Sequence, residues 1–435
     1  MEVERSTLVG IATGTPDGGV AVVRLSGPRA FAVAERLCGA ASTPRRMVRR
    51  RVALAGGAHD DALVVWMPGP NSFTGEDVVE LHVHAGARNV GMVVQACLAA
   101  GAKAAGPGDF SRRAFELGRM TLDQAEGVAA LIGAQTDAAL EQARRLVAGE
   151  LGREVDQLRD ALTDLRAEVE ANLDFPEDVD AGDTQRWIAE LDQRLRELRR
   201  WLGGFEAGRR AREKARVVLA GPPNGGKSSL FNALLGEARA IVADMPGTTR
   251  DYVEAELELG PYVAVLVDTA GLRETDEQVE SEGVARSRSQ LDRADVVLWI
   301  ESADARDAEE RPTCAAECVY VETKRDLGTR RPDWIGVAMP SQGIDVIQGR
   351  LRAWFEAGGS HAWIGLARHR SRAAEAIEQL EAARGILAEE GPLEAAAFEL
   401  GAAELRLGEI TGRSALGPIG EEVLDRIFSR FCIGK

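Results

Sequence analysis

A glycine-rich segment near the middle of the chain constrains the fold more than any other feature. Residues 221–228 read GPPNGGKS, which fits the pattern G-x-x-x-x-G-K-[ST]. A short apolar run, residues 217–220, precedes it, and residues 229–235 have the composition of a helix. Glycines let backbone N–H groups curl around phosphate oxygens, and Lys227 reaches the outer phosphates. We therefore predict a strand, a phosphate-binding loop and a helix, with Lys227 as a catalytic group.

Magnesium ligands are expected at three points after this loop begins. Ser228 supplies a hydroxyl directly, and Asp268, at the end of the apolar run 266–268, holds the ion through water. Gly271 follows closely and is expected to offer its N–H to the γ-phosphate. Between these motifs, Thr249 is the expected second hydroxyl ligand. A Thr-Thr pair alone is common in turns, but its position between the two other motifs favours the metal role.

A later motif identifies the base of the nucleotide. Residues 323–326 read TKRD after the apolar run 319–321, which fits the guanine-recognition pattern [NT]-K-x-D. The Asp326 carboxylate accepts both guanine N1–H and the 2-amino group, which adenine cannot match, so the nucleotide is expected to be GTP. Thr323 replaces the commoner asparagine, and residues 337–339 read VAM where Ser-Ala-Lys is usual. We expect weaker nucleotide affinity than in chains with full motifs.

The water-positioning residue is not where Ras-like switches have it. Leu272 follows the Asp-x-x-Gly motif, where a glutamine would orient the attacking water. Glu280, in the acidic segment 275–280, is the candidate replacement. The composition of that segment alone favours a solvated run of charge over a catalytic role.

Composition limits the partners of the chain. Its 53 Lys and Arg residues against 69 Asp and Glu residues give a net charge of −16. This argues against an autonomous nucleic-acid binder with a broad basic face. The densest basic run, residues 45–51, is interpreted as a solvated edge. We expect no signal peptide and no membrane span, and the odd number of cysteines, 5, suits a reducing cytoplasm.

The length of 435 residues suggests about three domains of ordinary size. Residues 1 to about 117 mix strand and helix signals, and residues 216 to about 356 alternate strands and helices. Long-helix periodicity occupies 122–175, 187–202 and the region after 373. Helices on both sides of a compact α/β domain suggest that this domain is an insertion. One helix–helix seam is spaced 4, 3, 4, 3, 4 and comprises Leu151, Val155, Leu158, Leu162, Leu165 and Val169.

The C-terminal residues FCIGK raise the question of an anchor, a reactive thiol or a frayed end. Prenylation is excluded, because Gly434 is not aliphatic and Lys435 is a poor terminal residue for that motif. An apolar face on the preceding helix, formed by Leu424, Ile427, Phe428 and Phe431, predicts that the helix packs down.

These motifs together resemble one family, the tRNA modification GTPase MnmE (TrmE) family, over nearly the whole chain. The resemblance rests on PGPNSFTGED at residues 68–77, PGDFSRRAF at 107–115, the P-loop, GTTRD at 247–251, DTAGLRE at 268–274 and the terminal CIGK. It implies a multidomain α+β and α/β protein: a tetrahydrofolate-binding, dimerising N-terminal domain, a discontinuous all-α helical domain, and an inserted Ras-like G domain. We expect these at residues 1–117, 118–212 with 358–435, and 213–357.

The resemblance also implies potassium activation. Asn224 would ligate K⁺ beside the phosphates, and Ala243, Met245 and Thr248 would complete its shell, with backbone carbonyls from the first two. K⁺ would then neutralise transition-state charge as an arginine finger does. By alignment Glu280 becomes the water-orienting residue. The expected contacts of GTP and its ions are Asn224, Gly225, Gly226, Lys227, Ser228, Ser229, Ala243, Asp244, Met245, Pro246, Gly247, Thr248, Thr249, Asp268, Thr269, Ala270, Gly271, Thr323, Lys324 and Asp326.

In the N-terminal domain the resemblance implies folate contacts from Arg24, Glu80, Arg119 and Lys435. Arg24 and Glu80 without the resemblance would describe a structural ion pair equally well. The folate would be the 5,10-methylene or the 5-formyl form of tetrahydrofolate. Cys432 would then stand near the one-carbon unit, either as a nucleophile or as a packed bystander.

The function implied is a cytoplasmic, K⁺-activated GTP hydrolase that works with the FAD protein MnmG in a heterotetramer or larger complex. It would place an aminomethyl or carboxymethylaminomethyl group on C5 of the wobble uridine of certain tRNAs. Two alternatives reuse such a G domain: a ribosome-assembly or signalling switch, and a membrane-associated mechanochemical GTPase. The first would usually carry an appended basic RNA-binding module and the second a basic amphipathic helix, and the sequence shows neither.

Overall fold

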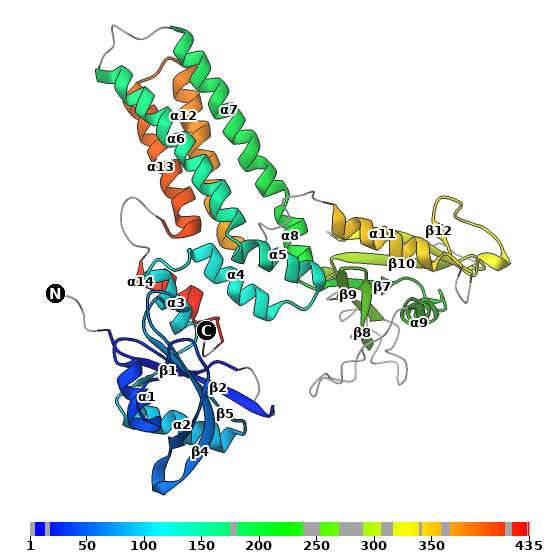
Figure 1. Ribbon diagram of the computed structural model, residues 1–435. Helices are drawn as coiled ribbons and strands as arrows, with labels where there is room; N and C mark the ends of the chain where they lie inside the picture. The colour runs from blue at the N-terminus through cyan, green and yellow to red at the C-terminus, as the bar shows by residue number, and fades with distance from the viewer. Residues whose placement is uncertain are drawn as a thin grey trace, which may run out of the picture. The chain divides into compact units, whose positions relative to one another are not determined.

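The computed structural model describes residues 5–13, 18–174, 181–237, 253–268, 290–305, 316–338, 342–357, 366–413, 420–432 and 434. The chain divides into two compact units (Figure 1). The first unit comprises Met1–Gly133, Arg144–Leu195 and Arg372–Lys435, and the second comprises Ala134–Ala143 and Arg196–Ser371. The fold is the expected multidomain mixture of α+β, all-α and α/β parts.

The first unit begins with a sheet of order β3-β4-β5-β2-β1-β6. Neighbouring strands are antiparallel except β1 and β6, which are parallel. The strands are β1 (Leu8–Ile11), β2 (Val20–Ser26), β3 (Val48–Ala53), β4 (His59–Met67), β5 (Val78–His84) and β6 (Lys103–Ala104).

Alternation along the central strands gives this sheet a buried face and a polar face. Val23 and Leu25 on β2 and Leu81 on β5 are fully buried beneath α1 (Ala30–Cys38) and α2 (Ala87–Ala99). Side chains alternate between the faces of a strand. Arg24 and Glu80, which are register partners, therefore project from the opposite face.

The remainder of the first unit is helical. Its shorter helices are α3 (Asp109–Glu116), α4 (Leu122–Gly133) and α14 (Glu421–Phe428), and the longer ones are α6 (Glu150–Asp174), α7 (Ala181–Gly203), α12 (Ala367–Ala388) and α13 (Leu393–Thr411). Residues 196–203 of α7 and 367–371 of α12 belong to the second unit. The predicted seam on α6 is confirmed, since all six of its residues are at most 2% exposed. Side-chain ion pairs join α6 to α13 through Arg166 and Glu404, and α7 to α12 through Asp192 and Arg384.

The second unit contains a sheet of order β12-β11-β10-β7-β9-β8 in which only β8 runs antiparallel to its neighbour. Read from β8 to β12, with β7 counted as the first strand of this sheet, the order is 2-3-1-4-5-6, a doubly wound arrangement. Its strands are β7 (Ala215–Ala220), β8 (Val253–Leu259), β9 (Tyr262–Asp268), β10 (Val296–Ser302), β11 (Glu317–Thr323) and β12 (Ile335–Gly336). Its helices include α8 (Phe205–Arg212), α9 (Lys227–Glu237) and α11 (Ile344–Glu356), while α5 (Asp137–Val147) crosses from this unit to the first.

The strand and helix predicted on either side of the P-loop are β7 and α9. Val217 and Leu219 on β7 share one buried cluster with Leu230 on α9 and Leu351 on α11. The apolar residues that flank the loop therefore anchor it to the core at both ends.

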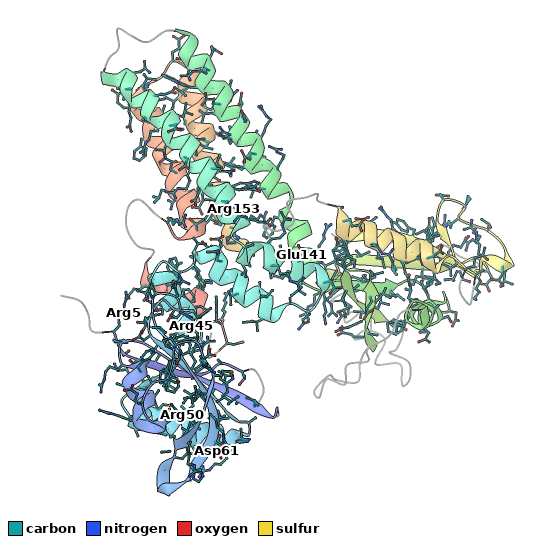
Figure 2. The ribbon with its side chains drawn as sticks, viewed as in Figure 1. Arg5, Arg45, Arg50, Asp61, Glu141 and Arg153 are labelled. Carbon is teal, nitrogen blue, oxygen red and sulfur yellow. The ribbon has the colours of Figure 1, made fainter. Side chains whose placement is uncertain are left out.

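The basic run at residues 45–51 leads into an edge strand, β3, which begins at Val48, in line with the expected solvated edge. Arg49 and Arg51 both approach Asp61 of β4, at 3.1 and 4.0 Å, and their side chains are 75% and 68% exposed. Figure 2 labels Arg45, Arg50 and Asp61 in this region. Charge on an edge strand discourages pairing with other chains. Among the helices that the structure describes, none has the length and apolar character needed to cross a membrane.

Candidate functional site

Three motifs separated in sequence, together with Ser302, meet at one edge of the second unit's sheet. The P-loop follows β7, Asp268 ends β9, Ser302 ends β10 and Thr323 ends β11. These strands are parallel, so their carboxyl ends share an edge, where ligands of such sheets bind.

Two glycines let the P-loop pass close to its neighbours. Gly221 has a φ of +139°, and a Cβ there would lie 2.0 Å from the Ile300 carbonyl oxygen. Gly226 has a φ of +89°, and its Cβ would lie 3.0 Å from Thr323 Oγ1. A larger residue would be strained at either position, would be blocked at Gly221 and would crowd Thr323 at Gly226.

Lys227 and Asn224 occupy different environments in the loop. Lys227 is buried at the start of α9, and its Nζ donates to the carbonyl oxygens of Gly221 and Pro222 at 2.8 and 2.7 Å. This holds the ammonium group inside the curl of the loop. Asn224 is exposed and adopts a left-handed φ of +61°. Ser228 and Ser229 are exposed as well, so their hydroxyls are open to a ligand.

Thr323 makes a connection that the sequence did not lead us to expect. Its Oγ1 is buried and donates to the Gly225 carbonyl oxygen at 2.5 Å. The asparagine that is commoner at this position ties the motif to the P-loop through its side-chain amide, which Thr323 lacks. The structure shows that the threonine hydroxyl makes a link of its own.

Lys324 and Asp326 follow at the surface. Lys324 has a left-handed φ of +53°, and its Nζ pairs with Asp304 at 3.0 Å. Asp326 is exposed in the short 3-10 helix η4 (Arg325–Leu327). The segment that replaces Ser-Ala-Lys lies beside it, because the Arg325 N–H donates to the Val337 carbonyl oxygen at 3.1 Å.

Asp268 is 3% exposed and pairs in register with Leu219 of β7 and Val253 of β8. A carboxylate and a serine hydroxyl are hard oxygen donors of the kind that Mg²⁺ prefers. The other predicted contacts in this domain lie outside the described residues: Ala243, Asp244, Met245, Pro246, Gly247, Thr248, Thr249, Thr269, Ala270, Gly271 and Glu280.

A second polar site lies on the polar face of the N-terminal sheet. The Arg24 guanidinium donates to Glu80 Oε1 from Nε at 2.9 Å and from Nη2 at 2.8 Å. Glu80 Oε2 also lies 3.4 Å from His82 Nε2. The rings of Phe73 and Phe110 flank the guanidinium at 5.1 and 5.8 Å. The residues present an acceptor and aromatic faces, which fits a flat heterocycle that carries N–H groups.

The C-terminal tail reaches this site, as predicted. Arg24 Nη1 donates to the Gly434 carbonyl oxygen at 3.5 Å, and the Gly108 N–H donates to the Cys432 carbonyl oxygen at 3.3 Å. The preceding helix packs down through Leu424, Phe428 and Phe431, which are 6%, 2% and 8% exposed. The Cys432 side chain itself is exposed, so it does not pack against the domain. Lys435 lies outside the described residues.

Arg119 lines a separate cavity of about 650 Å³ whose lining includes neither Arg24 nor Glu80. The walls combine Arg5, Arg112 and Arg413 with the apolar Phe115 and Leu424. Arg119 packs on the loop that carries Phe73, since its Cγ lies 3.0 Å from where a Cβ on Gly75 would stand. Of the three predicted folate contacts that the structure describes, Arg24 and Glu80 form a pair, whereas Arg119 lines a different cavity.

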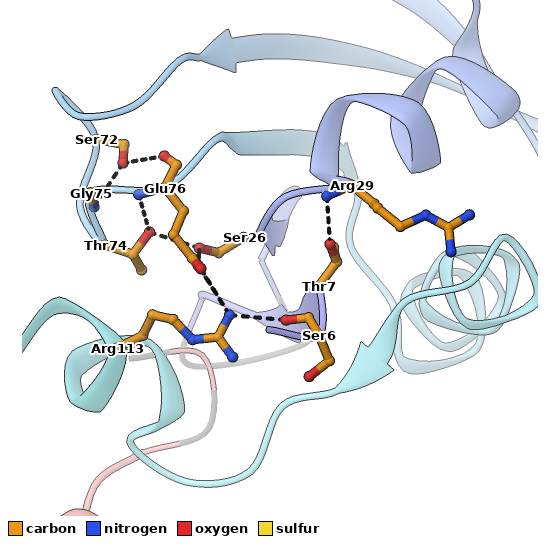
Figure 3. A network of polar contacts seen from close by, with 9 residues as sticks. All are labelled: Ser6, Thr7, Ser26, Arg29, Ser72, Thr74, Gly75, Glu76 and Arg113. Atoms are coloured by element: carbon orange, nitrogen blue, oxygen red, sulfur yellow. Dashed lines mark hydrogen bonds and ion pairs between the residues drawn. The ribbon is translucent and has the colours of Figure 1, made fainter. Parts of the chain in front are cut away.

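A polar network that the sequence analysis did not anticipate joins two of the quoted motifs, residues 68–77 and 107–115 (Figure 3). Arg113 Nη1 donates to both carboxylate oxygens of Glu76 at 3.1 Å, and to the Ser6 carbonyl oxygen at 2.9 Å. Ser26 Oγ donates to Glu76 Oε2 at 2.9 Å and lies 2.7 Å from Thr74 Oγ1. This network holds the loop that presents Phe73. The two motifs were the only sign of this network in the sequence, and nothing in the sequence indicated that they contact each other.

Comparisons with known proteins cover almost the whole chain. A family profile described as "GTP-binding protein TrmE N-terminus" matches residues 7–119, and one described as "MnmE helical domain" matches residues 122–432. A protein of Halorhodospira halophila named "tRNA modification GTPase MnmE" is 43% identical over 455 residues, covering 99% of this chain and 96% of that protein. Proteins of the same name from Phenylobacterium zucineum and Symbiobacterium thermophilum are 39% and 41% identical, with 99% of each chain covered.

Among solved structures, the G domain of the T. maritima FeoB iron transporter is 21% identical. It covers 33% of this chain and 99% of that one, with a TM-score of 0.25. A likeness at this level adds no weight to the assignment.

Proposed function

Since the chain belongs to the MnmE family of tRNA modification GTPases, we propose how its sites serve that activity. The enzyme is a GTPase that acts in tRNA modification. The proposed reaction places an aminomethyl or carboxymethylaminomethyl group on C5 of the wobble uridine. The partner is the FAD protein MnmG, in a heterotetramer or larger complex. The one-carbon donor is 5,10-methylene- or 5-formyl-tetrahydrofolate.

The proposed domains are a dimerising, folate-binding domain at residues 1–117, a helical domain at 118–212 and 358–435, and a G domain at 213–357. The observation that supports an inserted G domain is the sheet of the second unit, whose strands all fall between β7 and β12. The proposed active form is a homodimer located in the cytoplasm, where its tRNA substrate is found.

Lys227, Ser228 and Asp268 carry the proposed phosphate and magnesium chemistry. Lys227 is already oriented inward by the carbonyls of its own loop. Ser228 would bind Mg²⁺ directly and Asp268 through water, and Thr249 would add a second hydroxyl. Bound Mg²⁺ supplies charge neutralisation at the phosphate oxygens.

Potassium is the proposed second cation. Asn224 is the exposed residue of the P-loop with a left-handed backbone, which presents its side chain at the loop surface. Ala243, Met245 and Thr248 would complete the shell, and Glu280 would orient the attacking water.

The observation that carries the folate proposal is the approach of Gly434 to the Arg24–Glu80 pair, at 3.5 Å from Arg24. It brings the C-terminal residues, with the exposed Cys432, to the polar face of the N-terminal sheet. Arg24 and Glu80 would bind the pterin, and Lys435 and Arg119 would add positive charge. Bound folate supplies the one-carbon unit. The exposure of Cys432 favours a reactive role over a packed one.

The rate of GTP hydrolysis in K⁺ compared with Na⁺ tests the G-domain part of the proposal. We expect a strong preference for K⁺ in the purified full-length chain, and its loss in Asn224→Ala. Equal rates of GTP hydrolysis in K⁺ and in Na⁺ would contradict the assignment of Asn224 as a K⁺ ligand.

Mass spectrometry of tRNA nucleosides tests the overall function. A strain that lacks the protein should lose the modified wobble uridines and regain them on complementation. Unchanged uridines would overturn the proposal and favour a ribosome-assembly or signalling switch.

A further inference from the structure

We infer that Glu322 is a positioning residue for guanine recognition, because its buried carboxylate holds the segment that bears Asp326. The inference rests on the proposed function, in which Asp326 reads the guanine base. Glu322 stands next to Thr323 at the end of β11 and is 1% exposed.

The carboxylate of Glu322 binds the recognition segment, residues 324–331, at its far end. Oε1 accepts the adjacent backbone N–H groups of Arg330 and Arg331, both at 2.8 Å. Two N–H groups on one carboxylate oxygen make a charge-assisted anchor for the backbone that returns from η4. These two hydrogen bonds fix the position of the C-terminal end of the segment that contains Asp326.

The same carboxylate also binds the segment near its start. Glu322 Oε2 lies 2.9 Å from Arg325 Nη1. Arg325 in turn donates from Nε to Thr329 Oγ1 at 3.0 Å. Asp326 therefore sits between two points that one buried side chain holds, at Arg325 and at Arg330.

The backbone of Glu322 joins this segment to the loop that replaces Ser-Ala-Lys. Its carbonyl oxygen accepts the Val337 N–H at 2.8 Å. Arg325 packs against Gly336, where a Cβ would lie 2.8 Å from Nη1. Thr323 is hydrogen-bonded to Gly225 of the P-loop. Residues 322 and 323 therefore connect the P-loop, the recognition segment and Val337, the first residue of the loop that replaces Ser-Ala-Lys.

Glu301 provides a matched comparison within the same sheet. It is register partner to Glu322, on β10, and is 3% exposed. Its carboxylate accepts from Trp299 Nε1 at 3.2 Å and lies 3.6 Å from Arg331 Nη2. It is a buried glutamate of the same type, but the partners of its carboxylate among the described residues are side chains, one of them that of Arg331 at the end of the recognition segment.

The two substitutions are therefore expected to differ in base discrimination. Hypoxanthine lacks the 2-amino group of guanine and forms only one of the two hydrogen bonds to Asp326. In Glu322→Gln the charge that holds Arg325 is lost, and Asp326 shifts relative to the P-loop. The loss of binding affinity is therefore expected to be larger for GDP than for IDP.

Calorimetric titration of the full-length chain with GDP and with IDP tests this. For Glu322→Gln we expect GDP affinity to fall about tenfold and the GDP:IDP affinity ratio to fall about fivefold, the scale of a weakened charge-assisted hydrogen bond. The KM for GTP should rise while kcat at saturating GTP stays close to wild type. Glu301→Gln should keep the wild-type ratio.

A wild-type ratio in folded Glu322→Gln, or an equal fall in Glu301→Gln, would overturn the inference. If Glu322→Gln does not fold, Arg325→Met removes only the partly exposed partner and should lower the ratio about two- to threefold. An unchanged ratio in that variant would also overturn it. Asp326→Asn distinguishes a failure of the Glu322 inference from a failure of the proposed guanine recognition. An unchanged GDP:IDP affinity ratio in that variant would mean that guanine recognition is wrongly assigned to Asp326.

Discussion

The phosphate-binding edge and the Arg24–Glu80 face are assembled in opposite ways. At the first, each motif is a short run of residues at the end of a strand, and parallel strands bring the ends together. At the second, Arg24 and Gly434 are in contact although 410 positions separate them in the sequence. The residues of the first site can be predicted from short runs of sequence. The pairing of residues at the second site is seen only in the folded structure.

The difference also appears in what holds each site. The P-loop is held by its own backbone, by glycines against the Ile300 carbonyl and by one hydroxyl from Thr323. The N-terminal face is held by ion pairs and by the packing of α14. Substitutions should therefore act through ligand chemistry at the first site and through docking at the second.

The largest effect is expected for Lys227→Ala. It removes the cation that reaches the outer phosphates, so kcat for GTP hydrolysis should fall about 10²- to 10³-fold. Phosphate release by the purified chain measures this. Lys214→Ala is the control, since Lys214 pairs with Glu256 at 2.5 Å and should retain a near-normal rate. A Lys227→Ala rate within about threefold of wild type would contradict the P-loop assignment.

A large effect on folate binding is expected for Arg24→Ala. The substitution leaves Glu80, 18% exposed, without its guanidinium partner and removes a contact to the tail. The affinity for 5-formyl-tetrahydrofolate should fall about tenfold or more. Fluorescence titration measures it, with Arg49→Ala as control because that side chain is 75% exposed. Equal affinities in the two variants would mean that the Arg24–Glu80 pair is structural only.

Gly434→Ala tests whether docking of the tail matters. Gly434 has a φ of +94°, and a Cβ there would lie 1.8 Å from the Ile11 carbonyl oxygen, so the tail must move. Amide exchange at Gly108, which donates to the Cys432 carbonyl, should accelerate, and folate affinity should fall several-fold. Gly420→Ala serves as control, because no heavy atom of the described residues lies within 4 Å of where its Cβ would stand. Unchanged exchange at Gly108 would show that the tail contributes nothing to the site.

Substitutions at Thr323 should have a smaller effect. Thr323→Val removes the 2.5 Å hydrogen bond to Gly225 and should weaken GDP binding about threefold, toward the lower end of the range for one neutral hydrogen bond. Thr323→Asn tests the expectation of weaker affinity in this chain. Because the hydroxyl already makes a link, the asparagine variant should change the dissociation constant less than the valine variant does. The reverse order would mean that the link to Gly225 carries no binding energy.

The smallest effect concerns thiol reactivity. Burial raises the pKa of Cys38 to about 11 and that of Cys97 to about 12. A thiol reacts as its thiolate, and at pH 8 about a thousandth or less of either group is ionised, so labelling should increase only as the pH approaches these values. Cys432 is exposed and should be alkylated first. Mass spectrometry after iodoacetamide treatment at pH 8 checks the order, and prior labelling of Cys38 would refute it.

The sequence by itself determined the classes of element and the local chemistry. The GPPNGGKS loop predicted β7 and α9, the heptad-like spacing predicted the buried seam of α6, and TKRD predicted the guanine-recognition segment. Such patterns are readable because hydrogen bonding and side-chain periodicity are set by neighbours along the chain.

Only the tertiary structure decided which distant groups meet. It paired Arg24 with Glu80 and Gly434, placed Arg119 in a different cavity, gave Thr323 a partner in the P-loop, and anchored residues 330 and 331 on Glu322. The physical reason is that a buried carboxylate or hydroxyl must find partners in space. Those partners are set by strand register and helix packing, which no run of adjacent residues specifies.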